Sequence, residues 1–246
     1  MSVEPVDPQH FLFRLQQATP RMWVTPTLIG LNGLIWGVMV LSGVSWLSPR
    51  AMDLALWGGN FLPFTLREPW RLLSATFLHG GLMHLAFNLW ALRDVGRLVE
   101  RFYGNGQMAL IYLVAGLSGS MTSLFFSART GVSVGASGAI FGLVGALLAA
   151  LYTQAGLLPP ALVASMRSSM LGFVGVSLVL GFTVGFVDNA AHLGGLAAGA
   201  LMGVVLVEKF DESVPRRVVV GRAMLAMGLA GAGLWMAWWR LAGAAG

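Results

Sequence analysis

The chain has no cysteine and few charged residues. The absence of cysteine excludes a disulfide, a thiolate nucleophile and a cysteine-ligated metal site. Charged residues make up only 10% of the 246 residues, whereas 57% are hydrophobic; a typical soluble domain carries about a quarter charged residues. The sequence therefore predicts an all-α, polytopic membrane protein.

The sequence also lacks a signal peptide and a strong excess of positive charge. The N-terminal stretch lacks a charged start followed by an apolar run and a cleavage site, so we expect no signal peptide. The net charge of +5 is small, and basic loops are common in membrane proteins, so no nucleic-acid partner is expected. Without a targeting segment and with short tails, the chain is expected in a bacterial inner membrane.

Seven apolar segments approach the length of about 20 residues that crosses a membrane as a helix. They cover roughly 26–47, 73–92, 107–125, 137–152, 170–186, 189–207 and 218–239, and the second continues to residue 101 as an amphipathic end. With a cytosolic N-terminus, most of the 15 Lys and Arg residues fall on the cytosolic side, as the positive-inside rule favours. The second, fourth and sixth segments then begin at the outer face.

Four polar side chains lie near the outer ends of these three segments. His84 and Asn88 are four residues apart on one face of the second, Ser137 begins the fourth, and His192 lies near the start of the sixth. The fourth segment is short enough to cover only about 24 Å of a hydrocarbon core of about 30 Å, so Ser137 is expected below the membrane surface. Polar groups at that depth usually face a cavity or the bundle interior.

Together these side chains contain the parts of an acyl-transfer centre. Serine is a weak nucleophile until a base takes its proton, and histidine has a pKa suited to that work. The turn G-A-S-G (135–138) places Ser137 at a helix N-terminus, where free backbone N–H groups could stabilise an oxyanion. Taken singly, each residue also has a structural explanation, a helix cap for Ser137 and buried hydrogen-bonding residues for the others.

Small residues should bring the fourth and sixth segments together. Glycines recur along both, at 138, 142 and 145 in the fourth and at 195, 199 and 203 in the sixth. Such faces let two helix backbones approach closely in lipid, which would place Ser137 near His192. Generic helix packing is compatible with the same pattern.

The motifs resemble those of the rhomboid intramembrane serine proteases. Three carry the match, namely H-G-G-L-M-H-L-A-F-N (79–88), G-A-S-G (135–138) and A-H-L-G-G (191–195), supported by Trp70-Arg71 and G-R-L-V-E-R-F-Y-G (96–104). The resemblance covers roughly residues 23–207. It implies a cytosolic tail (1–22), a six-helix protease core (23–207), a charged cytosolic linker (208–217) and a seventh helix with the C-terminal end (218–246).

The resemblance also assigns chemical roles. It implies that Ser137 is the nucleophile and His192 the general base of a dyad with no carboxylate. The oxyanion hole would consist of His84, Asn88 and the backbone N–H of Ser137. Asp188, four residues before His192, stays open as a possible third member. No metal and no cofactor are implied.

Three further residues are expected to support the site, and two more are expected to have structural roles. Gly135 and Gly195 belong to the serine and histidine motifs, and Phe141 matches an aromatic position that packs against the base and is tyrosine in many members. Glu100 would match a structural carboxylate at the inner end of the second helix. His79 is expected to form hydrogen bonds where that helix begins.

The implied activity is hydrolysis of a peptide bond in or next to a transmembrane segment, in the outer half of the lipid bilayer. Single-span membrane proteins are the expected substrates, and a polar cavity should open to the outside between the second, fourth, fifth and sixth segments. The segment 182–189 and the fifth helix are the expected entry gate. The alternatives are a non-catalytic rhomboid-like protein that binds membrane helices and a small transporter; the oligomeric state is open.

Overall fold

The computed structural model describes residue 13 and residues 15–17, 19–126, 131–183, 187–206 and 216–244. These residues are largely helical, and the one β-type contact among them is an isolated bridge. The longer helices are α2 (Val24–Leu41), α6 (Leu82–Ala91), α7 (Arg97–Tyr103), α8 (Asn105–Phe126), α9 (Ser137–Thr153), α10 (Pro160–Thr183), α11 (Asn189–Leu206) and α12 (Arg216–Ala244). Short helical pieces are α3 (Ala51–Leu56), α4 (Leu62–Thr65), α5 (Arg71–Ser74), η1 (Ala75–Phe77), the π-helical η2 (Leu92–Gly96) and η3 (Ala155–Leu157).

Length and composition confirm a multi-pass integral membrane protein. Within the described residues, five helices are long and apolar enough to cross a membrane, namely α2, α8, α10, α11 and most of α12. A bent pair, 71–77 with 82–103, makes up to six. The apolar helix α9 has only 17 residues, in line with the short fourth segment expected from the sequence.

The second predicted helix does not begin at residue 73. Residues 71–77 and 82–103 are bent by 91° relative to each other, so α6 begins at Leu82. Gly81 forms the break with a φ of +115°, and a Cβ there would collide with the carbonyl of Leu47. Glycine can adopt this positive φ and leaves room for the backbone of Leu47. The apolar pattern of the sequence indicates neither the positive φ nor the close approach of that backbone.

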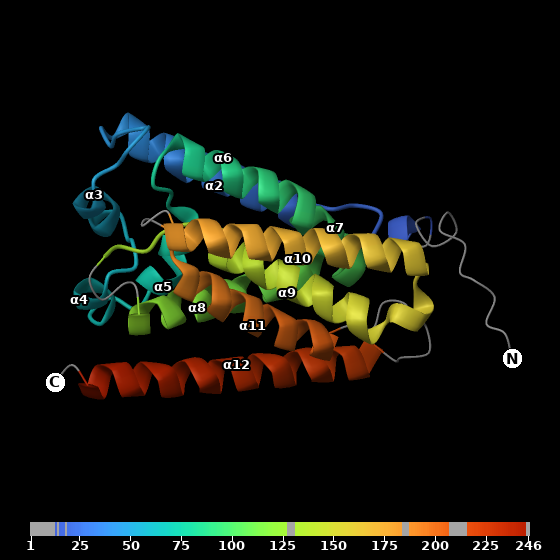
Figure 1. Cartoon of the computed structure of the whole chain (residues 1–246). Coiled ribbons are helices and arrows are strands. Elements are labelled where there is room, and N and C mark those ends of the chain that lie inside the picture. Colours follow the sequence, from blue (N-terminus) through green and yellow to red (C-terminus); the bar gives the residue numbers. More distant parts are fainter. Residues whose placement is uncertain are drawn as a thin grey trace, which may run out of the picture.

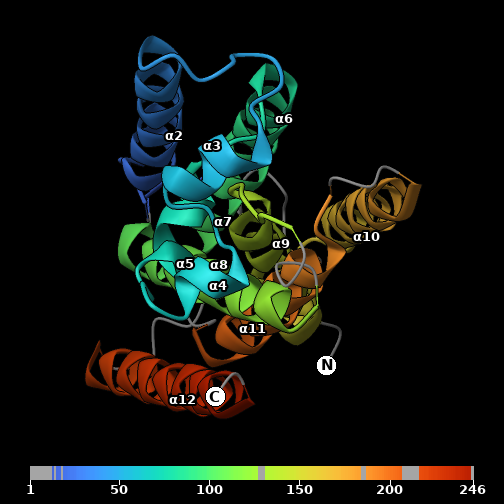
Figure 2. The ribbon, with the colours of Figure 1, turned by 90° about the vertical axis from the view of Figure 1, so that its left-hand side faces the viewer.

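Helix α9 lies in the middle of the bundle, with α6, α7, α8, α10 and α11 around it (Figure 2). Most of its residues are buried. It crosses α11 through glycine: a Cβ on Gly195 would overlap the carbonyl of Gly138, and one on Gly199 would overlap the backbone of Gly142. Backbone-to-backbone contact of this kind is what the small-residue pattern predicted.

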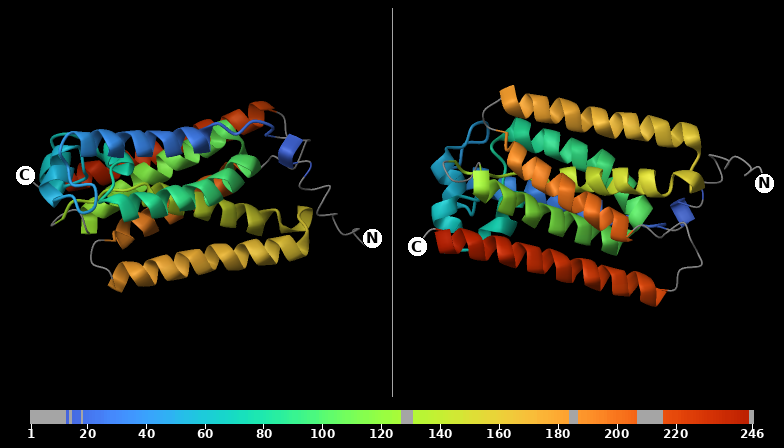
Figure 3. Two further views of the ribbon diagram at one scale, coloured as in Figure 1. Left: turned by 90° about the horizontal axis from the view of Figure 1, so that it is seen from above. Right: turned by 60° about the horizontal axis from the view of Figure 1, so that its bottom comes forward.

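Helices α10 and α12 lie at opposite sides of the bundle (Figure 3). Among its described side chains α10 buries only Val163, and α10 begins ten residues before the start expected at 170. Proline at its first position favours that earlier start, because it lacks the N–H that a first turn leaves unpaired. Helix α12 packs against α8 through Leu241, Trp238 and Leu234.

Helices α6, α9 and α11 all begin at one end of the bundle, where α3, α4 and α5 lie (Figure 1). Helix α2 begins at the opposite end of the bundle, and α12 ends where α6, α9 and α11 begin (Figure 1). This arrangement agrees with the seven crossings expected from the sequence. Glu100, fully buried, accepts hydrogen bonds from the backbone N–H groups of Trp23, Val24 and Thr25 and so joins α7 to the start of α2. The predicted linker 208–217 lies largely outside the described residues.

Candidate active site

Gly135 organises the approach to α9. Its φ is +126°, and its N–H donates to the carbonyl of Ala75 at 2.9 Å. A Cβ on Gly135 would lie 2.8 Å from Nε2 of His84 and 3.7 Å from Oγ of Ser137. The His84 ring and the half-buried Ser137 hydroxyl therefore flank one position, and only glycine leaves it open.

The His84 ring is oriented by the turn that precedes it. The N–H of Gly80 donates to Nδ1 of His84 at 3.1 Å. A neutral imidazole that accepts at Nδ1 carries its proton on Nε2. That proton therefore lies on the side of Gly135 and the Ser137 hydroxyl, where it can be donated to a developing oxyanion.

Asn88 lies one helical turn after His84 and is buried at 5% exposure. Its Nδ2 donates to the carbonyl of His84 at 2.8 Å, which leaves one amide hydrogen for a second acceptor. His79 is fully buried in the break before α6, and its ring meets the His84 ring edge-on at 5.2 Å. The Asn88 side chain therefore bonds the backbone of His84, while the His79 ring contacts its imidazole.

His192 lies in the first turn of α11 and is 5% exposed. Its imidazole stacks on the ring of Phe141, with centroids 4.1 Å apart and planes within 8°. Phe141 follows Ser137 by four residues on α9, so the stack sets His192 against the helix that begins with the serine. Ala191, the preceding residue, packs on Gly138, the residue after Ser137.

Asp188 does not contact the His192 side chain through a hydrogen bond. One carboxylate oxygen accepts from the hydroxyl of Ser123 on α8, and the other accepts from the N–H of Ala191 at 3.0 Å. Nδ1 of His192 is buried without a hydrogen-bond partner in the described part of the chain. Sequence reasoning missed Ser123, because nothing in an apolar helix containing several small polar residues distinguishes the one that faces a carboxylate.

A cavity of about 520 Å³ opens beside His84. Its lining comes from the segment after α2, from α3, from the start of α6 and from the segments that enter α9 and α11. The residues that form it include Leu47, Pro49, Met83, His84, Ser133 and Asp188. The sequence predicted a wall from the fifth helix, and this is wrong for the described residues: none of the lining belongs to α10. Residues between 47 and 54 form part of the lining instead.

The part of the sequence that carries the candidate catalytic residues matches a known protein domain. The model of the rhomboid domain matches residues 66–209, more than half of the chain. The chain belongs to the rhomboid family. The matched range includes Ser137, His192, His84 and Asn88.

Three rhomboid proteins from a plant and a bacterium are similar to this chain. RHOMBOID-like protein 4 of Arabidopsis thaliana is 39% identical over 163 residues, which are 65% of this chain and 40% of that protein. Rhomboid protease GluP of Bacillus subtilis (strain 168) is 39% identical over 158 residues, 64% of this chain and 29% of GluP. Inactive RHOMBOID-like protein 8 of Arabidopsis thaliana is 35% identical over 154 residues, 61% of this chain and 42% of that protein. The chain thus spans less than half the length of these relatives.

The family contains both a protease and a protein named inactive. Membership in the rhomboid family therefore supports an intramembrane protease or another rhomboid-like function. The arrangement of the polar side chains in this chain is therefore the basis for choosing between a protease and a non-catalytic rhomboid-like protein.

Proposed function

We propose that this rhomboid protein is an intramembrane serine endopeptidase with Ser137 as nucleophile and His192 as general base. One observation carries the proposal: the Ser137 hydroxyl and the Nε2–H side of His84 flank the same open position at Gly135. A nucleophile and an oxyanion donor have to meet around one reacting carbonyl in this way. The stacking of His192 on α9 supports its role as the base.

The reaction follows from these positions. Oγ of Ser137 attacks the carbonyl carbon of the scissile peptide while His192 takes the hydroxyl proton. His84, Asn88 and the N–H of Ser137 donate to the oxyanion. His192 then gives the proton to the leaving amine, and a water molecule hydrolyses the acyl-enzyme with His192 again accepting a proton.

Single-span membrane proteins are the proposed substrates, cut in the outer half of the bilayer with the N-terminus of the enzyme in the cytosol. A helical substrate hides its carbonyls in hydrogen bonds and has to unwind, so helix-destabilising residues near the cut should favour cleavage. We place entry beside α10, the least buried of the helices around α9; residues 184–186 of the proposed gate lie outside the described part. The relatives come from a plant and a bacterium, so the bacterial inner membrane stays a prediction of the sequence.

The test uses the purified wild-type chain in liposomes with a single-span substrate, beside a serine-directed phosphonate. We expect cleavage within or next to the span, and a phosphonate adduct on the peptide that contains Ser137. A chain that cuts none of several helix-destabilised substrates and takes no phosphonate would instead support the helix-binding alternative. The inactive relative is the observation that favours that alternative.

The Phe141 stack gives a specific prediction. We expect Phe141→Ala to lower kcat by about tenfold, because the imidazole loses the ring that sets its plane and misplaced catalytic groups cost rate steeply. Phe141→Tyr keeps the stacked ring and should retain cleavage within about threefold of wild type. Rates on one substrate in liposomes would measure both, and equal loss in the two variants would contradict a role for the stack.

The Asp188 contacts give a second prediction. Because both carboxylate oxygens are bonded elsewhere, we expect Asp188→Asn to keep kcat within about tenfold of wild type, whereas removing a triad aspartate costs about 10⁴. The amide keeps an acceptor for the N–H of Ala191 and can donate to Ser123. Ser123→Ala should have a similarly small effect, and a loss in Asp188→Asn as large as in His192→Ala would make Asp188 the third catalytic member.

A further inference from the structure

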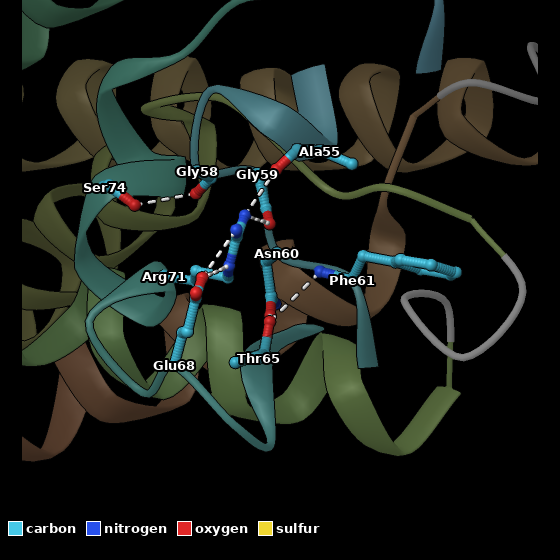
Figure 4. Close-up of polar contacts among 9 residues, drawn as sticks. All are labelled: Ala55, Gly58, Gly59, Asn60, Phe61, Thr65, Glu68, Arg71 and Ser74. Carbon is cyan, nitrogen blue, oxygen red and sulfur yellow. Dashed lines mark hydrogen bonds and ion pairs between the residues drawn. The ribbon is translucent and has the colours of Figure 1, made fainter. Parts of the chain in front are cut away.

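Asn60 is a buried residue that bonds to three parts of the chain. Figure 4 shows it beside Thr65 and Phe61. Asn60 lies between α3 and α4 and is fully buried. Its N–H donates to the carbonyl of Ser133 at 3.0 Å, and its carbonyl accepts from the N–H of Ser133 at 2.8 Å, which forms the isolated antiparallel bridge. The bridge joins the α3–α4 turn to the segment that leads into Ser137.

The side-chain amide of Asn60 is held in one orientation. Nδ2 donates to the carbonyl of Ser120 on α8 at 2.8 Å, and Oδ1 accepts from the hydroxyl of Thr65 at 3.0 Å. The Thr65 hydroxyl in turn accepts from the N–H of Phe61 at 3.1 Å. An aspartate at position 60 would have a similar shape, but it would place a buried carboxylate oxygen against the Ser120 carbonyl, and neither oxygen could donate. The position therefore requires an amide.

The turn that carries Asn60 is fastened by a second set of contacts (Figure 4). Arg71 donates to the carbonyl of Ala55 and forms an ion pair with Glu68 at 2.6 Å. Ser74 donates to the carbonyl of Gly58 at 2.7 Å, and Gly58 has a φ of +106°. Asn60 is therefore attached to a rigid support and not to a free loop.

We propose that Asn60 is a positioning residue for the nucleophile Ser137, which rests on the proposed function. Ser133 is tied to Asn60 and Gly135 to Ala75, so the segment entering α9 is held at two points just before the serine. The Ser137 hydroxyl and the His84 ring face each other only while Gly135 keeps its place. A displacement of about 1 Å in such a constellation can cost about a hundredfold in rate.

The experiment compares Asn60→Ala and Asn60→Asp with wild type in two activity measurements. We expect phosphonate labelling of Ser137 and kcat for cleavage to fall together by about 10- to 100-fold, with KM within about threefold. The matched control is Asp53→Asn, an amide–carboxylate exchange in the preceding α3, where Asp53 forms a surface ion pair with Arg50 at 2.9 Å. This control should keep wild-type values.

Hydrogen exchange tests the structural effect of Asn60 on residues 131–136 separately from its effect on catalysis. Amide exchange of the peptide covering 131–136 should speed up in both Asn60 variants and stay unchanged in Asp53→Asn. The backbone carbonyl of residue 60 still accepts from the N–H of Ser133, but it is no longer held in place by the side-chain amide. This readout needs no catalysis. Should the Asn60 variants fail to fold, Thr65→Val should show the same changes at smaller size, because it removes the hydroxyl that donates to Oδ1 of Asn60 and accepts from the N–H of Phe61.

The outcomes are distinct. Wild-type labelling and kcat in Asn60→Ala would overturn the proposal, as would an activity loss that appears in KM alone. Unchanged exchange at 131–136 would overturn it as well, since the segment would then not depend on Asn60. If the wild-type chain neither cleaves nor takes the phosphonate, the proposed function fails and takes the catalytic role of Asn60 with it, whatever the exchange shows.

Discussion

Ser137→Ala is expected to abolish cleavage and phosphonate labelling together, with a loss in kcat of about 10⁴-fold or more. Alanine removes only the hydroxyl at the start of α9, so the packing of Gly138 and Phe141 against α11 stays intact. Helical content and thermal midpoint in micelles should therefore match wild type. The measurement is the rate of cleavage of one single-span substrate in liposomes, beside the labelling rate.

Further variants test whether the loss is specific to the proposed dyad. His192→Ala should lose cleavage to a similar extent, and the double variant should be no worse than either single one, because nucleophile and base act as a unit. Ser42→Ala, which removes an exposed hydroxyl at the end of α2, serves as the control and should cut at the wild-type rate. Cleavage by His192→Ala at close to the wild-type rate would mean that another group, Asp188 or His84, takes the serine proton.

Gly199→Ala should destabilise the chain strongly, although it adds only a single methyl group. The added Cβ would overlap the carbonyl and Cα of Gly142, which are backbone atoms that cannot rotate away. Overpacking of this kind costs about 1–3 kcal/mol and sometimes more. Because α11 has to move away from α9, His192 should lose its place, and we expect kcat to fall at least about tenfold.

The matched control for Gly199→Ala is Gly172→Ala on α10. A Cβ on Gly172 meets nothing within 4 Å, so the same substitution there should be neutral or stabilise the helix by up to about 1 kcal/mol. Thermal midpoints in micelles and cleavage rates in liposomes would measure both variants. Equal midpoints for the two would show that α9 and α11 do not need backbone contact.

Sequence reasoning predicted the helices well where the signal is local. The expected 107–125, 137–152 and 189–207 differ from α8, α9 and α11 by no more than two residues at either end. The length of an apolar run and the small residues at a helix start are both properties of a single segment, so they predict the bounds of that helix directly. The start of the second helix was missed because the break at Gly81 depends on the passing carbonyl of Leu47, distant in sequence.

The candidate site divides in the same way. Ser137, His192, His84 and Asn88 were singled out because polar residues are rare in apolar segments, and the orientation of those segments placed them at one end. Neither the Ser123 contact with Asp188 nor the Asn60 bridge to Ser133 was predicted. Their residue types are ordinary in loops and helices, and only their partners give them a role.

Residue types alone are enough to class this protein as an integral membrane protein and to show which polar side chains its helices carry. This is possible because the cost of placing polar groups in lipid is set residue by residue. Three features of the site arise from the folded arrangement. Gly135 lies between His84 and Ser137, the His192 ring stacks on Phe141, and the Asp188 carboxylate bonds to Ser123 and to the N–H of Ala191 instead of the His192 ring. These features join residues of α6, α8, α9 and α11 that are distant in the sequence, so they depend on how the helices pack. The glycine pattern predicted that α9 and α11 approach each other, but not which side chains then meet.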